Sequence, residues 1–207
     1  MQTPPSTLPA YAELQCVSNF SFLRGASRPE ELVERAAVLG YTALALTDEC
    51  SLAGAVRAHM AAKELGLPLL IGSQFRLSCE KLPLSLILLA ANRNGYGNLC
   101  ELITLGRTRA DKGTYRLHPA DLCTPETEYA HLRGMPDCLA ILTPEHGVDL
   151  DTLRRQAQWL AATFPQRAWI ALTLLLRAQD EHQRAAVMQI AEECGLPVVA
   201  TGDVCMH

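Results

Sequence analysis

Short apolar runs alternate with amphipathic segments along nearly the whole chain, and this alternation constrains the fold more than any other feature. We predict strands over residues 11–17, 42–46, 67–77, 82–91, 138–143, 168–176 and 196–204. We predict helices over residues 29–39, 51–65, 96–105, 118–122, 151–164 and 181–194. The strands are almost continuously apolar, as in a sheet whose two faces are both covered. The pattern therefore predicts an α/β fold.

Two distant stretches repeat one local pattern. Residues 64–72 and 193–202 each contain a helix end, a glycine, a proline, an apolar strand and a second glycine. This repetition favours a βα unit repeated into an irregular barrel of about seven strands, with an open doubly wound sheet as the alternative. No Gly/Ser-rich linker divides the chain, so we predict a single domain over residues 1–207. The chain stops just after its last strand, without a covering helix, and we expect the amino-terminal part of a longer protein.

Composition excludes several classes of function. The net charge of −4 argues against tight, nonspecific binding of this piece alone to nucleic-acid phosphates. Its eight cysteines form no C-x-x-C pair, and residues 1–5 lack the features of an export signal. These features predict reduced thiols and a cytoplasmic location. The longest apolar run, residues 82–91, is about half of a membrane span, so we expect no membrane partner.

Polar residues follow three short apolar runs of the predicted strands, at 47–49, 72–74 and 201–207. In a parallel α/β fold the carboxyl ends of the strands surround one crevice. Asp48, Glu49 and Asp203 would meet there and form a candidate metal or general-base site. Alternatively, Asp48 or Ser51 caps the helix predicted over residues 51–65.

The last residues offer a second set of donors. Asp203, Cys205 and His207 alternate, so an extended backbone would turn all three toward one ion, for which Zn²⁺ suits better than Mg²⁺. His207 is the last residue, however, and chain ends are usually mobile. Among the other histidines, His146 is best placed, because it follows a strand end, but it stands alone.

No sequence motif for a catalytic nucleophile or a phosphate-binding loop is present, and we predict no catalytic residue. The loop over residues 19–25 carries two phenylalanines, which we expect to pack against the barrel.

Several segments resemble a PHP (polymerase and histidinol phosphatase) domain, and more narrowly the amino-terminal domain of the error-prone, damage-inducible C-family DNA polymerases. The resemblance lies in residues 16–27, 45–48, 88–99 and 199–204, and the stretch Ser18–Ser27 is its most specific part. It implies an irregular seven-stranded barrel, which in the family holds up to three metal ions and hydrolyses phosphoesters. In some replicative polymerases this domain proofreads.

The family's metal-binding motifs can be placed on this chain position by position. The family's His-x-His motif falls on Gln15 and Val17, its Thr-Asp-His on Asp48 and Glu49, and its Gly-x-Glu on Gln74. A histidine at the start of a buried strand falls on Ser85, and the closing Asp-x-His falls on Asp203 and Cys205. Only Asp48 and Asp203 keep the family's residue. Valine has no lone pair, and the amides at 15 and 74 carry no charge to balance divalent ions.

We therefore expect a degenerate metal site, no cofactor in this domain and a structural role. The alternative is a residual phosphoesterase or 3′–5′ exonuclease with Zn²⁺ or Mn²⁺ on Asp48, Glu49, Asp203, Cys205 and His207. A third alternative is an unrelated α/β interaction module, with an open sheet or eight strands.

The resemblance also implies partners of a whole polymerase acting in translesion synthesis and damage-induced mutagenesis. These are the rest of the polymerase chain with its Mg²⁺, DNA, the sliding clamp and the accessory proteins of the mutagenesis cassette.

Overall fold

The computed structural model describes residues 9–79 and 82–207, and its strands follow one another through a single sheet in chain order. Residues 1–5, on which the export prediction depended, lie outside these ranges. The seven strands found there are β1 (Ala12–Cys16), β2 (Ala43–Leu46), β3 (Leu69–Leu77), β4 (Leu84–Ala90), β5 (Cys138–Leu142), β6 (Ala168–Leu172) and β7 (Val198–Ala200).

The sheet is mostly parallel, with one reversed strand. β1, β2 and β3 pair in parallel, as do β5, β6 and β7, whereas β4 runs antiparallel to both β3 and β5. The connection between β3 and β4 is too short for the crossover that a parallel pair requires. As a result, the first residues of β4 lie at the same end of the sheet as the carboxyl ends of the parallel strands.

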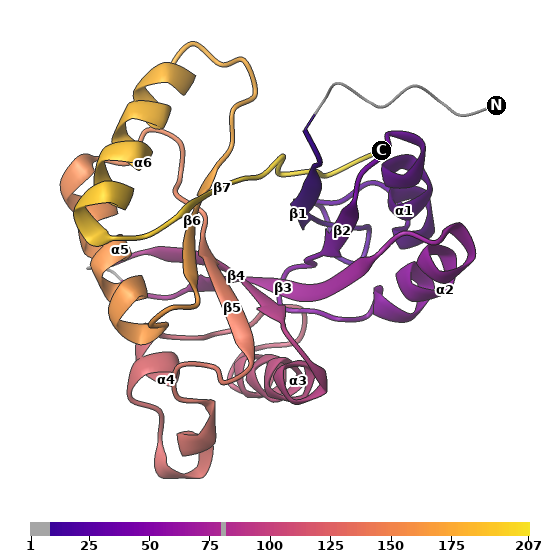
Figure 1. The fold of residues 1–207 in the computed structure, drawn as a ribbon. Coiled ribbons are helices and arrows are strands. Elements are labelled where there is room, and N and C mark those ends of the chain that lie inside the picture. Colours follow the sequence, from indigo (N-terminus) through magenta and orange to yellow (C-terminus); the bar gives the residue numbers. More distant parts are fainter. Residues whose placement is uncertain (1–8, 80–81) are drawn as a thin grey trace.

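The sheet curls until its two edges meet beyond the last strand. Cys16 and Val204 form an isolated parallel bridge, the Val17 amide donates to the Val204 carbonyl at 2.9 Å, and the Val204 amide donates to the Gln15 carbonyl at 2.8 Å. This contact closes β1 against the segment after β7 (Figure 1). The prediction of an irregular seven-stranded barrel in one α/β domain is confirmed, and the open sheet is excluded.

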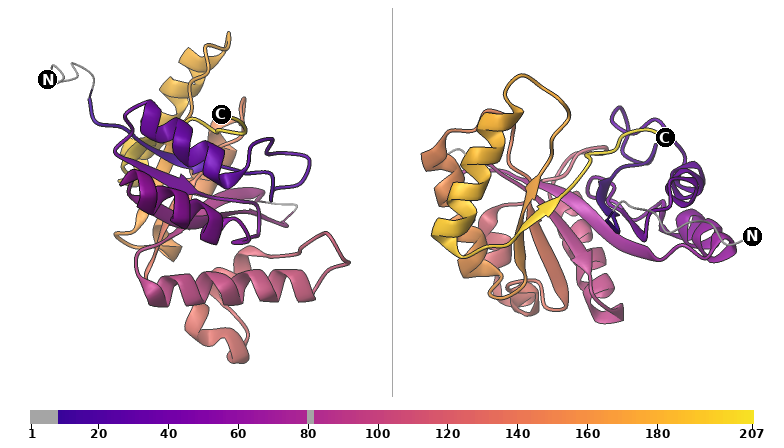
Figure 2. Two further views of the ribbon diagram at one scale, coloured as in Figure 1. Left: turned by 90° about the vertical axis from the view of Figure 1, so that its right-hand side faces the viewer. Right: turned by 45° about the horizontal axis from the view of Figure 1, so that its top comes forward.

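Helices cover the outside of the barrel in three groups (Figures 1 and 2). α1 (Pro29–Val38) and α2 (Ala55–Leu65) pack side by side next to β2 and β3, and α3 (Arg93–Thr108) packs on β3 and β4. α5 (Leu150–Thr163) and α6 (Asp180–Cys194) pack together beside β5, β6 and β7, while the short α4 (Pro119–Cys123) and the 3₁₀ helix Thr127–Leu132 follow α3. Within the described ranges, no helix is long and apolar enough to cross a membrane.

Apolar side chains fill both the interior of the barrel and the layer between sheet and helices. Ile87, Leu89 and Ile141 belong to one buried cluster with Ala45 and Ala171, whose small side chains fit where strands converge. A larger cluster includes the buried side chains of α3, α5 and α6 packed against the sheet. This packing fixes the strand ends that carry the polar residues, because well-packed interiors resist displacement.

Candidate functional site

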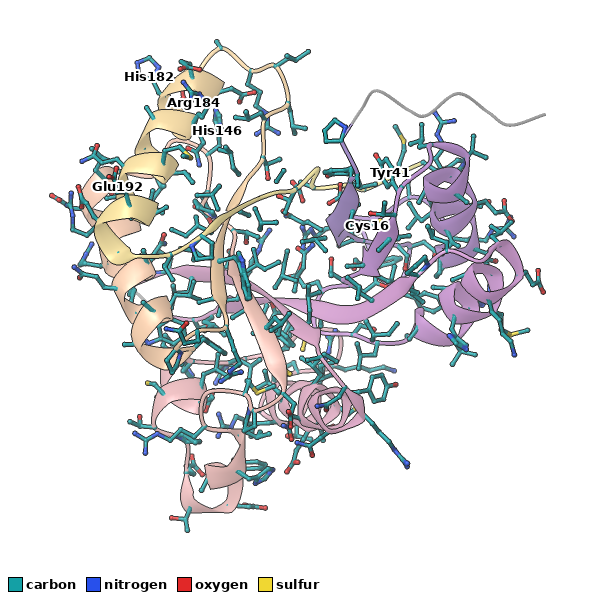
Figure 3. All side chains as sticks on the ribbon, viewed as in Figure 1. Cys16, Tyr41, His146, His182, Arg184 and Glu192 are labelled. Carbon is teal, nitrogen blue, oxygen red and sulfur yellow. The ribbon has the colours of Figure 1, made fainter. Side chains whose placement is uncertain are left out.

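A polar cavity of about 190 Å³ opens where the carboxyl ends of the parallel strands meet the start of β4. Its wall includes five of the eight positions placed by the family motifs, namely Gln15, Glu49, Gln74, Ser85 and Asp203. Glu49 and Asp203 share one crevice, as predicted from the sequence, whereas Asp48 is not among its lining residues and Gln74 lies within β3 rather than beyond its end. His146 also lines the cavity, from the loop after β5, and Figure 3 places it beside α6.

Both carboxylate oxygens of Asp48 accept hydrogen bonds from the loop after β1. Oδ1 accepts from the Ser18 amide at 2.8 Å and from the Ser21 hydroxyl at 2.7 Å, and Oδ2 accepts from the Ser18 hydroxyl at 2.8 Å. The side chain is 1% exposed. Three donors compensate a buried negative charge that would otherwise be costly.

The capping alternative for Asp48 and Ser51 is wrong. α2 begins at Ala55, later than predicted, and its N-cap is Gly54, without a side-chain hydrogen bond. Asp48 is held by the preceding loop instead. The Ser51 hydroxyl accepts from the Ala53 amide, two residues before the start of α2. The residues between 51 and 54 form a turn, which moves the helix start away from both side chains.

Glu49 is the centre of an ion-pair network. Its Oε2 accepts from Nη1 of Arg24 at 2.5 Å, and its Oε1 accepts from the Tyr115 hydroxyl at 2.9 Å. Nε of Arg76 lies 3.9 Å from Oε1. Burial alone would raise the pKa of Glu49, but the hydrogen bonds from Arg24 and Tyr115 and the charges of Arg24 and Arg76 outweigh it and lower this pKa.

The pKa of Arg24 moves in the opposite direction. Burial opposes its positive charge, yet the hydrogen bond to Glu49 and the nearby charges of Glu49 and Asp203 raise this pKa. Each partner therefore favours the charged form of the other.

The two glutamines at metal-motif positions act as both donors and acceptors. Nε2 of Gln15 donates to Asp203 at 2.8 Å, and Oε1 of Gln15 accepts from the Thr201 hydroxyl at 3.0 Å. Nε2 of Gln74 donates to the Thr47 hydroxyl at 3.2 Å, and its Oε1 accepts from Nη2 of Arg24 at 3.4 Å. An amide satisfies such two-sided bonding, whereas an ionised carboxylate only accepts.

The remaining motif positions are spread over the site. Val17 is fully buried, Ser85 lines the cavity, and the Cys205 thiol lies 3.5 Å from the Asp203 carbonyl. Burial and the Asp203 charge raise the pKa of Cys205, which disfavours the thiolate that binds metals.

The structure does not bring Asp203, Cys205 and His207 onto one face. Asp203 has a left-handed backbone, with φ 48°, so the strand alternation ends there. His207 lies at the end of the loop after β1 instead, where its Nδ1 is 2.7 Å from the hydroxyl of Ser27, two residues before α1. Among the residues of ranges 9–79 and 82–207, no group of three or more His, Cys, Asp or Glu side chains is arranged to hold a metal ion.

Sequence reasoning missed three residues of this region, Arg24, Tyr115 and Glu13. Glu13 is 1% exposed, and its Oε1 accepts from the Gln15 amide at 2.8 Å and the Gly202 amide at 3.0 Å, so it joins β1 to the end of β7. A basic residue in a loop directly after a strand was the one available signal for Arg24. Tyr115 comes from the irregular segment after α3, for which the sequence pattern gave no position.

The loop after β1 also corrects an expectation. Its side chains do not all pack, since Phe20 is 40% exposed, Phe22 84% and Leu23 91%. The loop folds onto its own serines and onto Asp48, so its small polar residues point inward and its apolar tip points outward.

A nearly closed barrel with a polar cavity at its strand ends is a recurrent architecture, and comparison with known proteins gives its class. The profile of the PHP domain matches residues 13–195, and the chain belongs to this family. An error-prone DNA polymerase of Bordetella parapertussis is 63% identical over 202 residues, and one of Ralstonia nicotianae is 57% identical over 205 residues. These matches cover 97% and 98% of the chain but 19% of each relative, so the chain spans about a fifth of their length.

Solved structures share the fold at low sequence identity. An amidohydrolase from Chromobacterium violaceum, with bound sulfate and no metal, superposes with a TM-score of 0.66 at 17% identity over 95% of this chain and 88% of its own. A two-domain protein from Bacteroides vulgatus, containing a predicted PHP-like metal-dependent phosphoesterase, superposes with a TM-score of 0.55 at 12% identity over 100% and 57%.

Proposed function

We propose that this PHP domain is a catalytically silent structural unit of an error-prone DNA polymerase. The carrying observation is that both acids of the Thr-Asp-Glu segment are already paired. Asp48 accepts three hydrogen bonds from the loop after β1, and Glu49 accepts from Arg24 and Tyr115. Divalent ions would have to displace these partners, and a cluster of ions needs several free anionic or imidazole donors.

The substitutions at the other positions support the same conclusion. Val17 offers no lone pair, while Gln15 and Gln74 replace charged donors with amides that are hydrogen-bonded on both sides. Buried carboxylates without cations repel one another, whereas neutral, satisfied groups hold the walls together. The residues present do not fit a metal cluster, and a silent site would contribute no proofreading to an error-prone enzyme.

The activity of the whole protein is part of this proposal. We infer that polymerisation, with Mg²⁺, belongs to the rest of the chain and serves translesion synthesis and damage-induced mutagenesis in the cytoplasm. DNA, the sliding clamp and the accessory proteins of the mutagenesis cassette would then be partners of the whole enzyme. The exposed leucines Leu23 and Leu176, 91% and 101% exposed, support packing of this domain against the rest of the polymerase.

A metal assay tests the silent site. The chain is purified without chelators, its Mn and Zn contents are measured by mass spectrometry, and phosphatase and 3′–5′ exonuclease activities are measured with each ion. We expect less than one tenth of an equivalent of metal, and activity no higher than that of an Asp48→Ala/Asp203→Ala variant.

Stoichiometric metal that this double variant loses, with activity lost in parallel, would establish the residual phosphoesterase or exonuclease instead. Because Asp48 also stabilises the fold, Asp203→Asn serves as the milder comparison.

A further inference from the structure

Arg24 reaches from the loop after β1 across the cavity to two of the family's metal positions. Its Nη1 donates to Glu49 and its Nη2 to Gln74, at 2.5 and 3.4 Å. Glu49 follows β2 and Gln74 lies within β3, so one guanidinium joins three neighbouring segments of the barrel.

The loop that carries Arg24 is fixed at several points. The amides of Arg24 and Gly25 both donate to the Ser21 carbonyl at 3.0 Å, and the Ala26 amide donates to the Cys205 carbonyl at 2.8 Å. Ser21 itself bonds to Asp48 and accepts from the Glu49 amide. The arginine is therefore presented to Glu49 by a preorganised loop, and its side chain is 28% exposed while that of Glu49 is 19% exposed.

Tyr115 and Arg76 complete the surroundings of the pair. The Tyr115 hydroxyl donates to Glu49 and accepts from the Arg76 amide at 2.8 Å, so a third polar group stabilises the carboxylate. A planar guanidinium beside a carboxylate of low exposure forms a strong, directional pair.

We propose that Arg24 is the built-in cation of this site and takes the place of the metal ions that the residues no longer accommodate. This inference rests on the proposed metal-free site and adds the residue that makes the loss of metal tolerable. The fixed positive charge neutralises Glu49 and ties the loop after β1 to β2 and β3. It also repels any divalent ion that approaches the same carboxylate.

A double-mutant cycle tests the pair. We would measure urea midpoints of the 207-residue chain and of its Arg24→Met, Glu49→Gln and Arg24→Met/Glu49→Gln variants. Methionine keeps most of the apolar stem of arginine and removes the charge. We expect each single change to lower the equilibrium constant for folding by at least tenfold. The factor by which the double variant lowers this constant should be at least fivefold smaller than the product of the two single factors.

The exposed pair Arg184–Glu181 on α6 is the matched control. Figure 3 labels its arginine. In the double-mutant cycle of this control pair, the factor for the double variant should equal the product of the two single factors within about twofold, because exposed pairs contribute little. Multiplicative effects at Arg24 and Glu49 as well would overturn the proposal, since Arg24 would then act through its packing alone.

A metal titration separates a charge role from a merely structural one. Binding of Mn²⁺ and Zn²⁺ to the chain and its variants is measured by isothermal titration calorimetry at pH 7. We expect Arg24→Met to bind Zn²⁺ at least tenfold more tightly than the unmodified chain, and Arg24→Met/Glu49→Gln to lose that gain.

Equal affinities in the unmodified chain and in Arg24→Met would overturn the built-in cation. Stoichiometric, tight metal in the unmodified chain would overturn the silent site, whatever the outcome of the cycle. The two failures are therefore distinguishable.

Discussion

Replacing Asp48 by alanine tests whether this acid acts as a structural acceptor. The change removes the acceptor of three hydrogen bonds of 2.7–2.8 Å and leaves the Ser18 amide and the hydroxyl hydrogens of Ser18 and Ser21 without an acceptor in a buried place. Hydrogen bonds to charged groups contribute about 1.5–3 kcal/mol each. The two hydroxyls can rotate toward other acceptors, so the full sum does not apply.

We therefore expect Asp48→Ala to lower the free energy of unfolding by about 3–4 kcal/mol, a large part of the roughly 5–15 kcal/mol typical of folded domains. For a chain of this size the midpoint of thermal unfolding should fall by about 6–16 °C. Asp48→Asn keeps one acceptor for the Ser18 amide and should cost about 1–2 kcal/mol.

The assay is urea and thermal unfolding followed by circular dichroism, with and without EDTA. Asp203→Asn is the control, because Asp203 accepts one hydrogen bond, from Gln15, and asparagine tolerates its left-handed backbone. It should cost less than about 1 kcal/mol. A structural role of Asp48 is refuted if Asp48→Ala is as stable as Asp203→Asn, or if EDTA destabilises the unmodified chain as much as Asp48→Ala does.

Three more predictions each concern the surroundings of one residue. Burial raises the pKa of Cys138 to about 12, so iodoacetamide at pH 8 should modify it only after unfolding. The half-buried Cys123 should react in the native state. Mass spectrometry at successive times measures both rates, and equal rates would contradict this. A Cβ at Gly25 would lie 2.0 Å from a backbone carbonyl oxygen, so Gly25→Ala should lower the free energy of unfolding by more than about 3 kcal/mol. Gly97 faces open space on α3, so Gly97→Ala should raise this free energy by about 0.5–1 kcal/mol. Urea unfolding measures both changes. The folded-state pKa of Glu49 is lowered, so its contribution to stability is present above its unfolded pKa of about 4.3 and is lost as the pH falls through the folded value. Urea midpoints of the unmodified chain and of Glu49→Gln should therefore differ at pH 7 and converge toward pH 3. A difference independent of pH would refute this.

The order of the elements and the end of the barrel that holds the polar residues were predictable from the amino-acid sequence alone. Apolar runs such as residues 84–90 and 138–142 predict buried strands, because a strand covered on both faces has apolar residues at nearly every position. The convergence of Glu49, Gln74 and Asp203 was predicted from the same pattern of strands, whereas Gln15 was placed by the family resemblance. The metal-motif positions came from resemblance, and they too lie in order along the chain.

The pairing of these side chains depends on the three-dimensional fold and was not predictable from the sequence. Arg24 and Glu49 are 25 positions apart, and Tyr115 and Glu49 are 66 apart, so no local pattern couples them. The outward tip at Phe22 and the start of α2 after Gly54 likewise depend on which groups the loop after β1 meets once the barrel closes. Hydrogen bonds and ion pairs are short-ranged and directional, so their partners are settled by the packing of distant segments and not by spacing along the chain.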